Sequence, residues 1–140
     1  MKGLPGLIRL HRWQLDEKRR QLVELQRLQD ELQEQLARLE AEIKGEQRTA
    51  AVEVATTAYG PYAQLAVMRR TKINHSLADV GRQINEARDA VSEAFQELKR
   101  YELLQEQRQK RALAVADRRA TIEQDELGLR NYRRQQSERD

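Results

Sequence analysis

The fold is decided at residues 58–64, which read AYGPYAQ and contain one of the two prolines of the 140-residue chain. The other is Pro5, so no proline interrupts the long tracts on either side of Gly60-Pro61. Glycine suits the left-handed position just past a helix end, and proline suits the first turn of a helix. The sequence therefore predicts three segments: a helix over about residues 7–57, a turn at residues 58–61 around Tyr59 and Tyr62, and a longer helix over about residues 62–136.

Apolar residues recur in both tracts at alternating steps of four and three. Nine of twelve such positions in the first tract are apolar, and the exceptions are His11, Lys18 and Gln29. The apolar nine are Leu4, Ile8, Leu15, Leu22, Leu25, Leu32, Leu36, Leu39 and Ile43. The second tract has no polar interruption over Ile73, Leu77, Val80, Ile84, Ala87, Val91, Ala94, Leu98 and Tyr101. This heptad repeat predicts an all-α fold, an antiparallel two-helix coiled-coil hairpin that forms one domain over residues 1–140.

Antiparallel packing assigns each seam residue a partner on the other helix. Aligning the two repeats yields pairs centred on residue 60: Leu22 with Leu98, Leu25 with Ala94, Leu36 with Ile84, Leu39 with Val80 and Ile43 with Leu77. Towards the termini the seam becomes polar, and the last pairs are Ile8 with Ala112 and Leu4 with Val115. The second helix then passes its partner beyond residue 116. We predict that this overhang of about 20 residues docks against another protein.

The tip of the predicted hairpin is almost uncharged. Residues 49–68 carry a single charge, on Glu53, whereas 35% of the chain is charged. One interpretation is a surface that exposes apolar and aromatic side chains to a partner. Its residues would be Tyr59, Tyr62, Leu65 and Met68. The alternative is that these residues close the hairpin on themselves, and the sequence does not choose between the two.

Composition argues against catalysis, metal binding and a membrane span. The chain has no cysteine, which excludes thiolate zinc sites and cysteine nucleophiles, and its histidines, His11 and His75, lie too far apart along the predicted hairpin to share a metal. The sequence contains no glycine-rich phosphate loop and no nucleophile elbow, and a two-helix hairpin has no concave interior. No stretch is long and apolar enough to cross a membrane. We therefore predict a protein that is not an enzyme and takes no cofactor.

The net charge of +3 is distributed unevenly, with basic residues concentrated near both ends of the chain. A hairpin would bring these basic segments to one end, where they could attract an acidic partner surface or simply form solvated helix faces. Nucleic-acid binding is the other class to consider, because arginine pairs occur at Arg19-Arg20, Arg69-Arg70, Arg118-Arg119 and Arg133-Arg134. Acidic residues lie near each pair and no continuous basic stripe follows. We therefore expect no nucleic-acid partner.

Two segments go beyond a generic coiled coil. They are WQLDEKRRQLVEL at residues 13–25 and IEQDELGLRNYRR at residues 122–134. Together with the early turn and the longer second helix, they resemble the FliJ family of flagellar type III export stalk and general chaperone proteins, in particular its alphaproteobacterial members. The resemblance implies a cytoplasmic protein, associated with the inner membrane only through the export apparatus. The implied partners are the hexameric flagellar export ATPase, the membrane export-gate protein and export chaperones.

The resemblance also implies which residues bind. The contacts with the ATPase ring would come from Trp13, Asp16, Glu17, Arg19, Arg20, Asp125, Glu126, Arg130 and Arg133, while the tip residues named above would face the gate or the chaperones. The simpler alternatives are that Trp13 lies flat on the flank of the seam and that the charges form helix-surface pairs such as Asp16–Arg20 and Glu126–Arg130.

Two other functions remain open at this point. One is the stalk of a virulence type III secretion system, and the other is a generic spacer that dimerises through its own seam. A stalk is expected to be monomeric.

Overall fold

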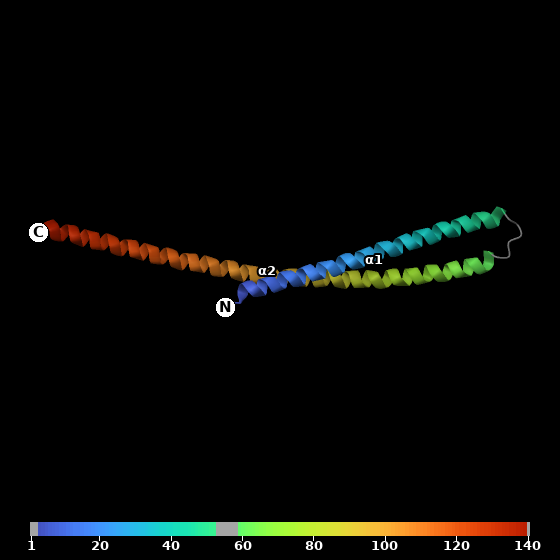
Figure 1. Ribbon diagram of the computed structural model, residues 1–140, viewed down its shortest axis with the longest axis horizontal. Helices are drawn as coiled ribbons and strands as arrows, with labels where there is room; N and C mark the ends of the chain where they lie inside the picture. The colour runs from blue at the N-terminus through green and yellow to red at the C-terminus, as the bar shows by residue number, and fades with distance from the viewer. Residues whose placement is uncertain (1–2, 53–58, 140) are drawn as a thin grey trace. The chain divides into compact units, whose positions relative to one another are not determined.

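The computed structural model describes residues 3–52 and 59–139 of the chain. They form two helices, α1 (Leu4–Val52) and α2 (Tyr59–Arg139), of 49 and 81 residues. The helices pack against each other as a hairpin, and the second is the longer (Figure 1). The predicted all-α hairpin with a longer second helix is confirmed.

Helix α1 begins earlier than predicted. The carbonyl of Gly3 accepts a hydrogen bond of 3.0 Å from the N–H of Leu7, so helical bonding starts at Leu4 rather than near residue 7. Pro5 does not prevent this, because the first N–H groups of a helix have no intrahelical acceptor and proline loses nothing there. Helix α1 is described as far as Val52, and the predicted end near residue 57 lies outside the described residues.

Gly60 and Pro61 lie inside helix α2, in its first turn. No glycine among the described residues has a positive φ, so the predicted left-handed role of Gly60 is wrong. Pro61 occupies a first-turn position, as expected, for the same reason as Pro5. The connection between the helices therefore falls on residues 53–58, which lie outside the described residues and include Ala58 of the predicted turn.

The chain divides into two compact units. Unit 2 is His11–Gln96, and unit 1 combines Met1–Leu10 with Glu97–Asp140. Both helices contribute to both units. The single hairpin domain predicted from the sequence thus has two packing regions, and each has its own part of the seam.

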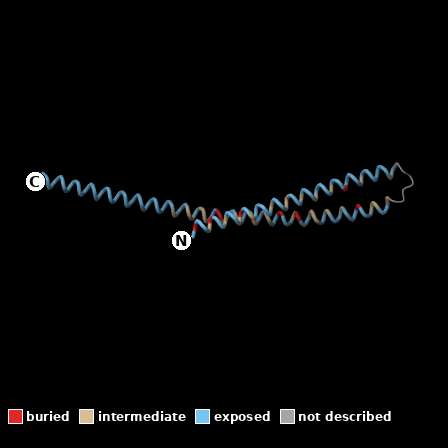
Figure 2. The backbone as a smooth tube through the Cα atoms, viewed as in Figure 1, coloured by how far each residue is buried: buried red, intermediate tan, exposed pale blue. Residues whose placement is uncertain are grey.

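The heptad seam is the core of unit 2. Its buried apolar residues are Leu15, Leu39, Ala66, Val80 and Ile84. Figure 2 colours the buried residues of both helices red. Every other predicted seam position in this unit is half-buried except Lys18, which is exposed. The seam residues predicted from the sequence are therefore the ones that lie between the helices.

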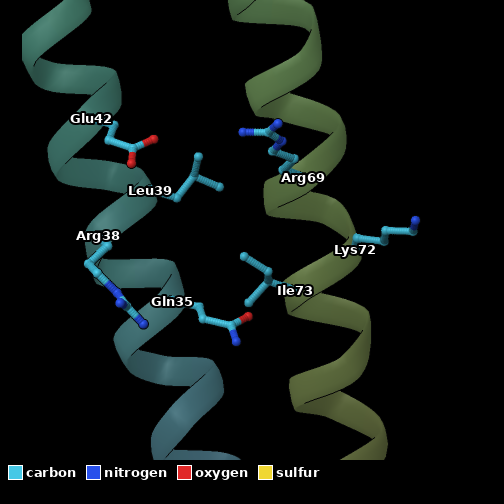
Figure 3. Close-up of a pocket in the computed structure, with 7 residues that line it drawn as sticks. All are labelled: Gln35, Arg38, Leu39, Glu42, Arg69, Lys72 and Ile73. Atoms are coloured by element: carbon cyan, nitrogen blue, oxygen red, sulfur yellow. The ribbon is translucent and has the colours of Figure 1, made fainter.

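The register of that seam differs from the prediction. In Figure 3 the side chain of Leu39 extends from α1 towards α2 at a level between Arg69 and Ile73, whereas Lys72 points away. These residues line a shallow groove together with Gln35, Arg38 and Glu42. The predicted partner of Leu39 was Val80, one to two heptads further along α2. The predicted pairing of Leu39 with Val80 is therefore wrong, although both residues are buried seam residues.

The physical reason is that a heptad repeat does not determine its own register. Moving one helix by a whole heptad buries the same residues, so the register depends on where the chain turns. In addition, each seam side chain inserts into a hole between residues of the facing helix rather than meeting one residue head-on. Leu39 accordingly extends towards the stretch of α2 between Arg69 and Ile73 rather than towards a single residue (Figure 3).

Tyr62 lies near two carboxylates of α1. Partial burial and the nearby carboxylates of Glu42 and Glu46 raise the pKa of the Tyr62 phenol. In a hairpin centred on residue 60, Glu46 would lie about 18 Å further along the helix than Tyr62's own partner and would act on it only weakly.

In unit 1 the start of α1 packs on the middle of α2. Leu4 and Ile8 are each only 3% exposed. The half-buried residues of α2 end with Gln105 and Arg108, and every described residue beyond Arg108 is exposed. Ala112 and Val115, the predicted partners of Ile8 and Leu4, are therefore uncovered.

Helix α2 continues past the start of α1 as a lone helix (Figure 1). This C-terminal segment, residues 109–139, is exposed on all sides in Figure 2. The predicted overhang is confirmed, and it begins about one heptad earlier than the sequence register implied.

Candidate functional site

The C-terminal segment carries a continuation of the seam that nothing covers. Val115, Ile122 and Leu129 follow one another at intervals of seven residues and occupy the heptad position that Val80 and Tyr101 hold inside the hairpin. They are 49%, 57% and 56% exposed. An apolar stripe in register with an existing coiled-coil seam has the geometry to pack on a further helix.

The alternate seam positions of the same segment are charged. Arg119, Glu126 and Arg133 follow Leu98, Gln105 and Ala112 by whole heptads, so they lie on the same face as the apolar residues. We call this face the uncovered stripe, and it consists of Val115, Arg119, Ile122, Glu126, Leu129 and Arg133. Asp125 and Arg130 flank it. Four of the residues predicted from the family segments thus lie on or beside one exposed helix face.

The predicted segment at the start of α1 presents a different face. Trp13 and Arg20 are one heptad apart, and the seam residues Leu15 and Leu22 lie two positions further on, about 200° round the helix. Trp13 is 60% exposed. It therefore points away from the seam, and the alternative in which it lies flat on the seam flank is not observed. We call this surface, with Trp13, Asp16, Glu17, Arg19 and Arg20, the outward face of α1, and Arg19 forms its edge nearest the seam, about 40° round the helix from Leu15.

Ion pairs on the outward face connect neighbouring turns. Arg20 pairs with Glu17 at 2.7 Å, and Arg19 lies 3.8 Å from Asp16. The predicted Asp16–Arg20 pair is replaced by these i,i+3 pairs. Both are largely exposed and are worth only about a few tenths of a kcal/mol, so they leave the arginines available to a partner.

The charges of the C-terminal segment are less engaged. Glu126 and Arg130, both of which the structure describes, form no ion pair with each other. The outward face belongs to unit 2 and the uncovered stripe to unit 1.

The tip of unit 2 carries a third surface. Leu65 and Met68 are 49% and 67% exposed, and Tyr59 and Tyr62 are half-buried. Leu65 and Met68 line a shallow groove that we call the tip groove, together with Val67, Arg69, Thr71, Lys72 and His75. The two predictions for the tip each describe part of it, because the leucine and the methionine face outward while the tyrosines are partly covered.

A family model identifies the protein family of the chain that carries these surfaces. The model for the flagellar FliJ protein matches residues 1–137, nearly the whole chain. The chain belongs to the FliJ family. Members of this family are non-enzymatic components of the flagellar export apparatus. No curated protein and no solved structure matches the chain significantly. Closeness to alphaproteobacterial FliJ proteins stays a prediction.

Among residues 3–52 and 59–139 there is no cluster of three or more histidine, aspartate or glutamate side chains with the spacing of a metal site. The grooves described above lie open on helix surfaces. No described helix is long and apolar enough to cross a membrane.

Sequence reasoning missed part of each FliJ surface. Counting heptads past Tyr101 identifies Val115, Ile122 and Leu129 as seam positions. The count does not show that they are uncovered, because that depends on where the partner helix stops. Val67 and His75 of the tip groove carry no sequence signal, since they are ordinary helix-surface positions that become a groove through their neighbours.

Proposed function

We propose that this FliJ protein is a stalk that binds the hexameric flagellar export ATPase through the uncovered stripe and the outward face of α1. The uncovered stripe carries the proposal. A lone helix of about 45 Å with apolar residues at every heptad loses favourable burial energy unless a partner covers it. The apolar residues would supply contact area, and Arg119, Glu126 and Arg133 would fix the register of that contact.

The tip groove is proposed as the surface for the membrane export-gate protein or for export chaperones. Leu65, Val67 and Met68 form an exposed apolar patch, and Arg69, Lys72 and His75 provide a polar edge. A flexible methionine beside polar groups is typical of surfaces that accept more than one partner. The half-buried Tyr59 and Tyr62 would then act by supporting the groove and by direct contact at their exposed edges.

The proposed location is the cytoplasmic side of the inner membrane. The protein would reach the membrane through the export gate and would insert no helix of its own. Its partners would all be proteins, with no nucleic acid among them.

Changing Arg19 and Arg20 together to glutamate is expected to weaken co-purification with the flagellar export ATPase by about tenfold or more, since a charge-complementary contact becomes repulsive. The matched control changes Lys44 and Arg48, two exposed basic residues of the same helix, to glutamate. Both variants should retain the helicity of the parent by circular dichroism. Binding that is unchanged in the first variant, or equally reduced in the control, would remove the outward face from the proposed contact.

The protein is expected to sediment as a monomer at micromolar concentration. The apolar seam residues are already covered within the hairpin, and the uncovered stripe alternates apolar with charged residues, which weakens self-association. Analytical ultracentrifugation checks this expectation. A stable dimer would favour a spacer that pairs through its own helices.

A further inference from the structure

The charged residues near the C-terminal end of α2 are grouped by sign along the helix. Residues 118–134 read RRATIEQDELGLRNYRR. They contain a first basic band, an acidic band and a second basic band, which consist of Arg118 and Arg119, then Glu123, Asp125 and Glu126, then Arg130, Arg133 and Arg134. No charge of opposite sign interrupts a band. The centres of neighbouring bands are about one heptad apart, which is roughly 10 Å along the helix.

The three bands lie on the uncovered stripe. Each band contributes one residue to the stripe itself, and these residues are Arg119, Glu126 and Arg133. They lie within about 40° of Val115 round the helix, and the other charges of each band flank them. All of these residues are exposed. A partner that packs on the apolar residues of the stripe therefore meets the three bands in order.

The charges of the bands are not neutralised within the helix. In the part of α2 that precedes the C-terminal segment in unit 1, opposite charges lie one turn apart and pair, as the guanidinium of Arg100 does with the carboxylate of Glu97 at 3.3 Å. No two side chains of the described residues 118–134 form an ion pair. Neighbours one turn apart within a band, such as Glu123 and Glu126, have the same sign and repel each other weakly. A partner with the opposite sign would relieve that repulsion.

The seam of unit 1 indicates that the partner element is a helix. One helix, the start of α1, packs on the seam positions of α2 before the stripe, and its Leu4 and Ile8 are buried. After Arg108 the same row of positions continues uncovered, with a width of about 80° round the helix. Ala112 and Ala116 line a shallow groove at its start, where their small side chains leave room for larger ones. The stripe therefore presents the surface that a single helix covers in a coiled coil.

A second copy of the same segment does not match the bands. The order basic, acidic, basic is the same from either end, so two aligned segments place like charges opposite each other whether they run parallel or antiparallel. Displacing one copy by a heptad matches two bands but leaves one basic band of each copy without a partner, and it shortens the apolar contact. The charges therefore favour a different chain.

We propose that the uncovered stripe binds a single partner helix whose apolar seam is flanked by charges in the order acidic, basic, acidic at heptad intervals. The proposal rests on the proposed function, in which this helix belongs to the export ATPase. The bands also fix how far along the stripe the partner sits. A partner helix displaced by one heptad, about 10 Å, would meet like charges in both bands that still overlap.

Stapled helical peptides test the proposal on the isolated full-length protein. Every probe is three heptads long, has leucine at its apolar seam positions and carries a fluorophore. The matched probe has glutamate, lysine and glutamate beside the seam in successive heptads, and a second probe of the same composition has glutamate, glutamate and lysine. Fluorescence anisotropy should show that the matched probe binds at least about tenfold more tightly, because only its charges complement all three bands in one register.

Reversing the charges of the stripe separates band recognition from general stickiness. The triple variant Arg119→Glu, Glu126→Arg, Arg133→Glu should bind the matched probe about tenfold or more weakly and should gain affinity for a lysine, glutamate, lysine probe. Lys110→Glu is the control. It changes the net charge by the same amount but lies about 140° round the helix from Val115, so it should leave both affinities unchanged. Circular dichroism should show the helicity of the parent in both variants.

Three results would overturn the proposal. They are equal binding of the two probes of the same composition, no saturable binding of any probe, and a dimer that forms through the stripe in analytical ultracentrifugation. A fourth result concerns the proposed function alone. If the probes bind as expected but the triple variant still co-purifies with the export ATPase, the banded partner helix is supported and its assignment to the ATPase is wrong.

Discussion

Replacing Ile84 by aspartate is expected to lower the free energy of unfolding by about 3 kcal/mol or more, because it places an unpaired carboxylate in a dry seam. Ile84 is 3% exposed and belongs to the seam of unit 2. A two-helix hairpin has no further layer of secondary structure into which the side chain of the introduced aspartate could turn. The cost therefore falls directly on the contact that joins the helices.

Urea unfolding followed by circular dichroism at 222 nm measures the effect. The matched control is Val23→Asp, the same kind of change at a position of α1 that is 44% exposed. Valine and aspartate have similar helix propensities, so this variant should change the free energy of unfolding by less than about 0.5 kcal/mol. Equal losses in both variants would mean that the seam does not hold the hairpin together.

Replacing Ile122 and Leu129 together by glutamate is expected to abolish co-purification with the flagellar export ATPase while leaving the stability of the hairpin unchanged. Both residues lie on the uncovered stripe, and each is more than half exposed. Neither belongs to the packed core of the described chain. Loss of two apolar anchors from one interface typically costs about 2 kcal/mol or more for each. Binding should therefore fall by at least about a hundredfold.

The chain offers a close control for this experiment. Leu113 and Leu127 are also exposed leucines of the C-terminal segment, but they lie on roughly the opposite side of the helix from the uncovered stripe. Changing both to glutamate alters charge and hydropathy in a comparable way. Retained binding in this control, with loss in the stripe variant, assigns the contact to one helix face. If both variants bind like the parent, the uncovered stripe is not the contact surface.

The stability prediction and the binding prediction rest on different features of the molecule. The sequence alone indicates which residues belong to the seam, but not which of them face each other. The apolar residues at Ile84 and Leu39 are recognisable from their heptad spacing alone, because a 3.5-residue repeat over many turns has no other common structural use. Their partners are not recognisable in this way. The repeat looks the same after every shift of seven residues, so local pattern contains no information on which heptad faces which.

The turn shows why the sequence prediction of register failed. Gly60-Pro61 has the composition of a turn, and the pairs were centred on it. In the structure these residues begin α2, because the first turn of a helix accepts proline and tolerates glycine at small cost. A register centred on them does not hold at Leu39, which lies level with Arg69 and Ile73.

By itself the sequence determined that this protein is a pair of long helices with a shared apolar seam, and its two terminal segments indicated the FliJ family. Tertiary packing alone decided where α1 stops along α2, and hence that the exposed helix begins after Arg108 and that Val115, Ile122 and Leu129 lie uncovered. The physical reason is that burial depends on the position of the partner helix, and in a periodic seam that position is fixed by the whole hairpin rather than by any residue in it.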